Sequence, residues 1–137
     1  MDLRSKIQVI PRRILTDDRG WFLKIMTGSE EHLLKTSMGE IYITHGKPYS
    51  IKGGHYHPMT NEWFTCIYGE VTLRLEDIVT HEQIEFVLSA DSPQTIYIPS
   101  NGAHTFFSKS DMVFSILAYA DRVYDSKDTI MFPEKKI

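Results

Sequence analysis

From about residue 39 onward, short apolar segments alternate with turn residues along the chain. The segments are rich in Ile, Val, Tyr, Phe and Thr. Their spacing of about ten residues is typical of an antiparallel sandwich or barrel, and differs from that of strands alternating with helices. The expected strands cover residues 39–45, 62–68, 70–77, 83–89, 94–100, 104–108 and 112–119.

Within 70–77, Val71, Leu73 and Leu75 alternate with polar residues, which predicts a strand covered on one side. The one helical pattern is SEEHLLKTS, residues 29–37, with a serine at its start to cap it. A helix there is about two turns long and cannot organise a fold. We therefore expect an all-β protein, a jelly roll or small closed barrel with one short helix.

The composition sets the scale and limits the partners. A chain of 137 residues fits a single domain, residues 1–137, large enough to bury a core. Its 42% apolar and 24% charged residues describe an ordinary globular protein. The net charge of -3 gives no electrostatic footprint for nucleic acid or an anionic membrane. Any phosphate that the protein binds must therefore be held by local groups.

The single cysteine, Cys66, cannot form an internal disulfide, and its apolar run WFTCIY predicts a buried, inert thiol. The N-terminal residues contain no apolar stretch of signal-peptide length, and no later run approaches the length of a membrane span. We expect a protein of the reducing cytoplasm that does not bind membranes.

The candidate chemistry lies in two histidine-bearing segments. His55 and His57 are two residues apart, so on a strand both side chains point into one space. The turn-prone residues 58–61 can reverse the chain and bring Glu62 beside them, and PSNGAH offers a third imidazole, His104. Three His and one carboxylate suit Zn, Fe, Mn or Ni, and the sequence does not choose among them. The alternative is a set of polar barrel residues without a metal.

The pattern H-x-H-x4-E-x6-G followed by P-x2-G-x-H resembles the two motifs of the cupin superfamily. The matching residues are His55, His57, Glu62 and Gly69 in the first motif and Pro99, Gly102 and His104 in the second. Ser108 stands where cupins commonly carry Asn. The resemblance implies a jelly-roll barrel, also called a double-stranded β-helix. In such a barrel the three His and the Glu point inward and bind a divalent metal, with zinc the expected ion.

A second resemblance covers nearly the whole chain. IPRRILTDDRGWF (10–22), IYIPSNGAHTFF (96–107) and AYADRVYD (118–125) resemble segments of the dTDP-4-dehydrorhamnose 3,5-epimerase family. The chain departs from that family because Glu62 replaces a Lys, and because the C-terminal extension that supplies an Asp partner for the catalytic His is missing. We therefore expect a protein that differs from a standard 3,5-epimerase.

Two other groups share more of the histidine segment. The run from Lys52 to Glu62 is similar to that of the metal-binding C-terminal cupin domain of capsular-polysaccharide enzymes that act on UDP-4-keto sugars. That domain is described as a zinc-dependent C3 epimerase. The dTDP-sugar 3,4-ketoisomerases have a similar Gly-x-His-x-His segment, with a Tyr at the distance that separates Tyr42 from His55 here.

These resemblances imply an isomerase of nucleotide-diphosphosugars. The leading hypothesis is an epimerase of a nucleotide-diphospho-4-keto-6-deoxyhexose, acting at C3 and possibly at C5 too through an enolate, in surface-polysaccharide biosynthesis. The first alternative is a 3,4-ketoisomerase. The second is a metal cupin of another function, a small oxygenase or a ligand-binding sensor, although such a protein has no need of the Asp-Arg-Gly-Trp-Phe opening.

The resemblances also imply roles for single residues. A metal-bound His55 cannot accept a proton through its ligating nitrogen, so Lys52, desolvated near the cation, is a second candidate for base or acid. Tyr119 shares strand parity with Leu117, the position of the family's acid, and is the third catalytic candidate. The predicted substrate-binding residues are Arg19, Tyr42 and Asp77, with Arg19 on the diphosphate; their structural alternatives are a surface turn, a packed aromatic ring and an acidic strand end.

We further expect a homodimer. An open strand edge on a jelly roll of this size is a liability for a monomer, and cupins of this size usually pair through their N-terminal strands. Residues 1–22 are therefore predicted to lie near the partner.

Overall fold

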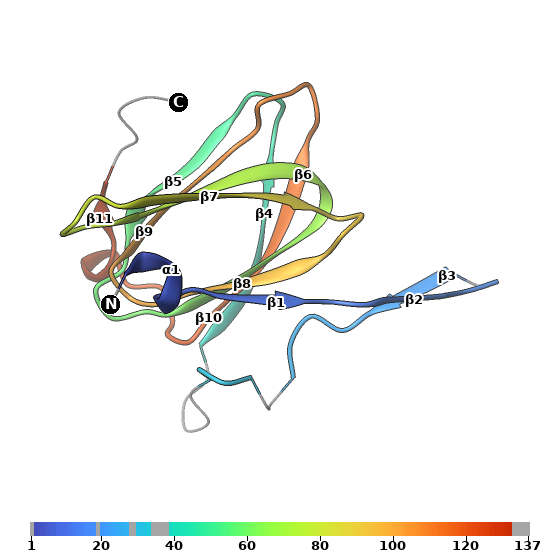
Figure 1. Cartoon of the computed structure of the whole chain (residues 1–137), viewed down its shortest axis with the longest axis horizontal. Coiled ribbons are helices and arrows are strands. Elements are labelled where there is room, and N and C mark those ends of the chain that lie inside the picture. The colour runs from blue at the N-terminus through green and yellow to red at the C-terminus, as the bar shows by residue number, and fades with distance from the viewer. Residues whose placement is uncertain (1, 19, 28–29, 34–38, 133–137) are drawn as a thin grey trace.

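The computed structural model describes residues 2–18, 20–27, 30–33 and 39–132. The described part is almost entirely β-structure (Figure 1). The strands are β1 (Gln8–Pro11), β2 (Ile14–Asp17), β3 (Gly20–Leu23), β4 (Glu40–Gly46), β5 (Ile51–Tyr56), β6 (Glu62–Asp77), β7 (Gln83–Ser89), β8 (Gln94–Ile98), β9 (Gly102–Phe107), β10 (Phe114–Ala120) and β11 (Ile130–Met131). A four-residue helix, α1 (Leu3–Lys6), and a 3-10 turn, η1 (Ser126–Asp128), complete the set.

The predicted all-β jelly roll with one short helix is confirmed, but the helix is not where the sequence pattern placed it. Of the segment 29–37, only residues 30–33 belong to the described ranges, and they form a turn. The helix lies instead at Leu3–Lys6, where the Asp2 side chain accepts a hydrogen bond from the Ser5 N–H and caps it. No helix within the described ranges is long and apolar enough to cross a bilayer.

The long strand β6 organises the barrel because it belongs to both halves of it. Its first part pairs with β8 and β10, and its second part pairs with β7 and β9. Gly69 lies where the partners change, with φ of +70°, and a Cβ there would collide with the carbonyl oxygen of Val113. The predicted segments 62–68 and 70–77 are therefore one bent strand, with the glycine at the bend.

The two halves of the barrel close on an apolar core. Val71, Leu73 and Leu75 are at most 2% exposed, so the predicted one-sided strand is confirmed. Burying one such side chain contributes about 1.5–3 kcal/mol to stability. Phe64 and Phe106 pack edge to face at 5.0 Å within the same core. At one end, the interior is lined by polar groups instead, and these form the cavity described below.

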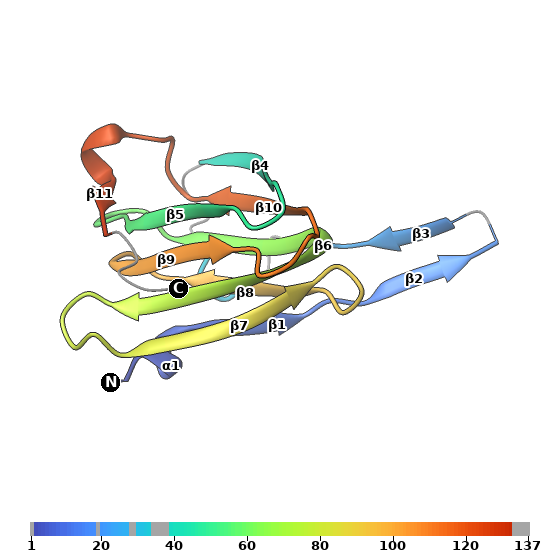
Figure 2. The ribbon, with the colours of Figure 1, turned by 90° about the horizontal axis from the view of Figure 1, so that it is seen from above.

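The N-terminal strands lie partly outside the barrel. Strand β1 pairs with β8, but β2 and β3 form a separate two-stranded sheet that projects away from the body (Figures 1 and 2). At the other end of the chain, β11 pairs with the edge of β5, so Met131 lies opposite His55, and Asp128 contacts His57 just after that strand.

Candidate active site

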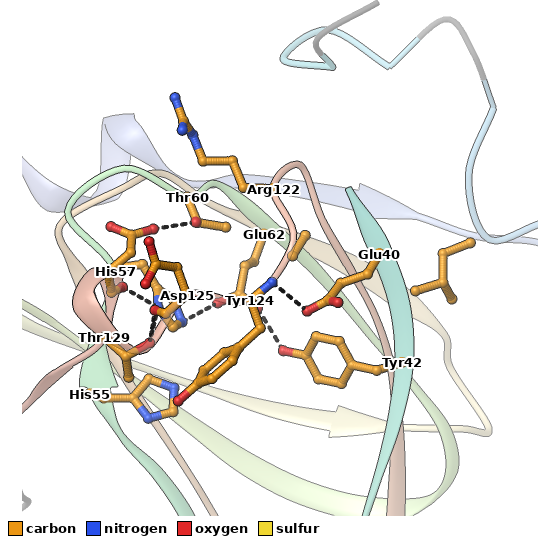
Figure 3. A pocket seen from close by; sticks show the side chains of 13 residues that line it. Glu40, Tyr42, His55, His57, Thr60, Glu62, Arg122, Tyr124, Asp125 and Thr129 are labelled. Carbon is orange, nitrogen blue, oxygen red and sulfur yellow. Dashed lines mark hydrogen bonds and ion pairs between the residues drawn. The ribbon is translucent and has the colours of Figure 1, made fainter. Parts of the chain in front are cut away.

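A cavity of about 360 Å³ opens at the polar end of the barrel (Figure 3). Its walls come from β4, β5, the start of β6, the end of β10 and the segment after β10. The described lining residues are Glu40, Ile41, Tyr42, His55, His57, Thr60, Glu62, Ala120, Arg122, Tyr124, Asp125, Asp128 and Thr129.

Three imidazoles lie close together here, as the histidine spacing predicts: His55 and His57 line the cavity, and His104 is buried next to them. His55 and His57 project from the end of β5 and His104 from β9, and one ring nitrogen of each lies within 4.8 Å of the others. Gly53, with φ of +88°, passes so close to the carbonyl oxygen of His104 that a Cβ would lie 2.8 Å from it. The register shifts just after this glycine, and His55 becomes the direct neighbour of His104.

Main-chain carbonyls fix the orientation of two of the rings. The Nδ1–H of His57 donates to the carbonyl oxygen of Asp128 at 2.9 Å, and the Nδ1–H of His104 donates to that of Gly102 at 3.0 Å. A carbonyl oxygen only accepts, so Nδ1 carries the proton in both rings. The two Nε2 atoms are left facing Oε1 of Glu62, at 3.0 Å from His57 and 3.5 Å from His104.

Glu62 is 3% exposed, which is costly for a carboxylate unless its oxygens are paired. Its Oε2 accepts a hydrogen bond from the Tyr42 hydroxyl at 2.6 Å. Oε1 is buried and, despite its closeness to His57, accepts no well-formed hydrogen bond from any described residue. Burial raises the pKa of Glu62, but His57, His104 and Tyr42 together outweigh that effect and hold the pKa below its ordinary value.

The imidazoles differ in their protonation. Burial and the charges of His104 and His57 lower the pKa of His55 to about 4, so this ring is neutral at pH 7, and it forms no hydrogen bond within the described ranges. Burial also lowers the pKa of His104. Burial lowers that of His57 as well, but contact with Glu62 reverses the shift, and the pKa is raised overall.

The residues fit a divalent cation. Imidazole nitrogens and a carboxylate are the donors that Zn²⁺ and similar ions prefer. A buried carboxylate oxygen without a proper hydrogen bond lies between two Nε2 atoms, each held in place by a carbonyl behind its ring. Such carbonyl contacts are the usual support of metal-binding histidines.

Two of the predicted catalytic residues are not at the cavity. Lys52 is exposed and its Nζ donates to the Thr44 hydroxyl at 2.7 Å, so the expectation of a desolvated amine beside the cation is wrong. Tyr119 is likewise not among the described residues that line the cavity. Ala118 and Ala120 are the β10 residues that point inward, whereas Tyr119 packs against Trp63 on the opposite face and its hydroxyl accepts from the Gly39 N–H.

The predicted substrate-binding residues have three different outcomes. Tyr42 lines the cavity, as expected. Asp77 does not: its carboxylate accepts from Lys6 and from the N–H groups of Val79 and Thr80, and it lines a separate hollow beside α1. These hydrogen bonds lower the pKa of Asp77, and those from the two backbone N–H groups have the largest effect. Asp77 therefore matches the structural alternative, an acidic residue at the end of a strand. Arg19 lies outside the described residues.

Residues 121–129 also line the cavity, which the sequence pattern did not predict. This segment crosses the cavity mouth and supplies Arg122, Tyr124, Asp125 and Asp128. The only hint in the sequence was the similarity of AYADRVYD to a closing strand, and no spacing rule connects these residues with the histidines. Among the described lining residues, Arg122 is the one Lys or Arg, set against the four carboxylates of Glu40, Glu62, Asp125 and Asp128.

Comparisons with known proteins agree with this architecture. The model of the polysaccharide biosynthesis C-terminal domain family matches residues 15–131. No curated protein matches the chain. A dTDP sugar isomerase from Desulfovibrio desulfuricans G20 has a TM-score of 0.84 at 17% identity, over 94% of this chain and 85% of that one.

Two further solved structures are similar. RmlC from Legionella pneumophila Philadelphia 1, a dTDP-6-deoxy-D-glucose-3,5-epimerase in complex with dTDP-4-keto-L-rhamnose, has a TM-score of 0.79 at 20% identity, over 92% of this chain and 72% of that one. The capsular polysaccharide assembling protein CapF from Staphylococcus aureus has a TM-score of 0.67 at 25% identity. The match covers 90% of this chain but only 33% of CapF, so this chain corresponds to one part of that protein. At these identities the first two likenesses establish the fold alone.

Proposed function

The chain belongs to the family of polysaccharide biosynthesis C-terminal domains, and from this we propose that it is an epimerase of a nucleotide-diphospho-4-keto-6-deoxyhexose. The reaction inverts C3, with C5 as a second candidate position, and serves surface-polysaccharide biosynthesis. The observation that carries the proposal is the meeting of Glu62 with His57 and His104 next to His55, a neutral ring on the cavity wall that has no hydrogen bond to any described residue. The similar folds of an RmlC 3,5-epimerase and a dTDP sugar isomerase support it.

The chemistry requires a base, a way to stabilise negative charge on the C4 oxygen, and a proton delivered from the cavity side opposite the base, by water or an acid, to the other face of C3. Removal of the C3 proton next to a C4 ketone gives an enolate. We assign a divalent metal, with zinc the expected ion, to Glu62, His57 and His104; when bound it supplies a Lewis acid for that oxygen. Tyr42 holds Oε2 of Glu62 and leaves Oε1 directed at the two imidazoles.

His55 has two possible roles, fourth ligand or base, and they exclude each other. We assign it the role of base. Unlike His57 and His104, it has no carbonyl behind its ring within the described ranges. It is neutral at pH 7 and lines the cavity, so a lone pair is free to accept the C3 proton. The nearby charge of Glu62 raises the pKa of His55 and so favours the imidazolium that forms.

The nucleotide end of the substrate carries two phosphates and needs a cation. Arg122 at the cavity mouth is the one guanidinium among the described lining residues, and a planar guanidinium matches phosphate oxygens in a bidentate manner. We therefore place the diphosphate at Arg122 and the hexose deeper, beside His55.

Solvent exchange tests the proposed activity. The protein is incubated in D₂O with dTDP-, UDP- and GDP-4-keto-6-deoxyhexoses, and deuterium is located by NMR. We expect incorporation at C3, or at C3 and C5, of at least one substrate. No exchange with any of them contradicts the proposal.

A second candidate function is a 3,4-ketoisomerase. It is favoured by the fold similarity to a dTDP sugar isomerase and by the position of Tyr42 on the cavity wall. NMR of the product separates the two activities, because an isomerase leaves the ketone at C3. An oxygenase would instead show iron-dependent oxygen uptake.

We also propose a homodimer. The β2–β3 sheet projects from the barrel, and an isolated two-stranded hairpin is marginally stable in water. On β4, which pairs only with β10 among the described strands, Ile41 and Ile43 are 70% and 62% exposed. An edge strand with exposed isoleucines is a surface that proteins normally cover. A second copy of the chain can pack against the β2–β3 hairpin and can also cover these isoleucines.

The substitution Ile43→Lys tests the dimer. A charge on the outer face of β4 is expected to shift the protein from dimer to monomer, because the buried amine would have no partner in an apolar interface. Light scattering coupled to size-exclusion chromatography measures the mass. Val87→Lys is the matched control, since Val87 is 64% exposed on β7. A wild-type monomer, or a dimer that Ile43→Lys leaves intact, contradicts the proposal.

A further inference from the structure

The segment that lines the cavity after β10 is attached to β5 and to the turn that follows it, and Asp128 makes the contacts with that turn. Strand β11, two residues later, adds to β5 through Ile130 and Met131. The N–H of Phe132 donates to the carbonyl oxygen of Gly54 at 2.7 Å. Asp128 itself is 9% exposed and contacts the turn that leads from β5 to β6.

Asp128 contacts three consecutive parts of that turn. One carboxylate oxygen accepts from the Met59 N–H at 2.7 Å, and the other accepts from the Thr60 hydroxyl at 2.5 Å. Its main-chain carbonyl accepts from Nδ1 of His57 at 2.9 Å. The carboxylate therefore holds the backbone just after His57, while the carbonyl of the same residue holds the ring of His57.

This arrangement keeps the ring proton of His57 on Nδ1, so that Nε2 faces Glu62 with its lone pair. The Glu62 carboxylate, 3.0 Å from Nε2, attracts the ring proton to Nε2, where it would block a metal. The Asp128 carbonyl holds the proton on Nδ1 instead. The bonds of the Asp128 side chain to Met59 and Thr60 help to place its own carbonyl. Loss of those bonds loosens the acceptor behind the ring, although β11 still pairs with β5.

We propose that Asp128 is a positioning residue, which aims Nε2 of His57 at Oε1 of Glu62 by clamping the segment 125–131 to the turn 57–60. The residue does not touch the reacting atoms and acts only through His57. Its consequence for metal binding rests on the proposed function, whereas its effect on the His57 ring does not.

The ring of His57 is the first measurement. In protein with ¹⁵N-labelled histidine, free of metal and substrate, the wild type is expected to show a protected Nδ1–H on His57. Asp128→Ala should speed solvent exchange of this proton by roughly five- to tenfold, the equivalent of losing one hydrogen bond. Thr60→Val, which removes one of the two side-chain bonds and keeps the shape, should give a smaller increase, and Thr60→Ser should restore the wild-type rate.

Metal affinity is the second measurement. If the wild type binds Zn²⁺ or Co²⁺, Asp128→Ala should weaken binding by about 10- to 100-fold, the usual cost of losing an outer-sphere partner of a histidine ligand. Asp111→Ala, on an exposed loop, should change neither quantity.

An unchanged Nδ1–H exchange rate in Asp128→Ala, or in Thr60→Val if the first variant does not fold, overturns the proposal. Since the ring signal is read without metal or substrate, this outcome is distinct from a failure of the proposed activity. A different outcome is a wild type that neither binds metal nor exchanges deuterium, but whose His57 Nδ1–H exchanges faster in Asp128→Ala. It would contradict the proposed function and support the positioning role of Asp128.

Discussion

Replacing Glu62 with Gln is expected to abolish tight binding of a divalent metal and to slow deuterium exchange into the substrate by about 10²- to 10³-fold. The carboxamide has the shape of the carboxylate, but no charge. With its oxygen on the Tyr42 hydroxyl, its NH₂ group takes the place of Oε1 and donates toward Nε2 of His57 and His104. The lone pairs that a metal needs are then occupied, and the site loses the charge that attracts a cation.

Metal content by mass spectrometry and exchange by NMR test this prediction on the same samples. The matched control is Glu85→Gln. Glu85 pairs with Arg74 and Lys109 on the outside of the barrel, where an ion pair contributes about 0–1 kcal/mol, so this variant should match the wild type. A Glu62→Gln protein that keeps its metal and its exchange rate would remove Glu62 from the site. A wild-type protein that contains no metal and is still active would show that the activity does not depend on a metal.

Much of the barrel follows from local pattern. Segment 83–89 is a strand with the predicted bounds, and 94–98, 102–107 and 114–120 differ from the expected strands by a few residues. In 83–89 and 114–120 burial alternates along the strand, as the sequence pattern predicts. Strands 94–98 and 102–107 are buried almost throughout and are found from their apolar and β-branched residues between turns. The N-terminal strands β1, β2 and β3 were not predicted, because their residues do not alternate in this way. β2 and β3 pair only with each other among the described strands, and no barrel face imposes a pattern on them.

The meeting of the four metal-ligand candidates was predictable because strand geometry and one reversal determine it. His55 and His57 lie at i and i+2, and the turn 58–61 returns the chain so that Glu62 faces them. The second motif then brings His104 beside His55. Their close approach is confirmed, with His55, His57 and Glu62 on the cavity wall and His104 buried next to them. Metal binding stays a prediction.

The predictions for Tyr119 and Lys52 differ from the structure because the strand face of one side chain and the burial of the other were inferred from a resemblance, and not from the packing of side chains. Tyr119 was assigned the face of an aligned neighbour, but the small residues Ala118 and Ala120 occupy the inner face of β10, where they leave room for the cavity. Lys52 precedes the bulge at Gly53, so it does not share the environment of His55. The contact of Asp128 with Thr60 joins residues 68 positions apart, and no local pattern reports such a contact.

Replacing His55 with Asn is expected to leave metal content close to that of the wild type and to lower deuterium exchange by about 10²- to 10⁴-fold, the usual contribution of a general base. The reason is the contrast between the rings. His57 and His104 are held by carbonyls and face Glu62, whereas His55 has a neutral ring with no hydrogen bond in the described part of the chain. Asn is polar enough for the cavity wall but cannot accept the C3 proton at neutral pH.

His81→Asn is the control for this substitution, because His81 is exposed and its φ of +63° is one that Asn tolerates. It should leave both metal content and exchange unchanged. If His55→Asn loses the metal together with the exchange, His55 is a fourth ligand, and the base must be another group on the cavity wall. If the variant keeps both, His55 takes no part in the reaction. Only retained metal with lost exchange separates proton abstraction at His55 from charge stabilisation at Glu62, His57 and His104, and this is the division of roles that the two kinds of ring environment predict.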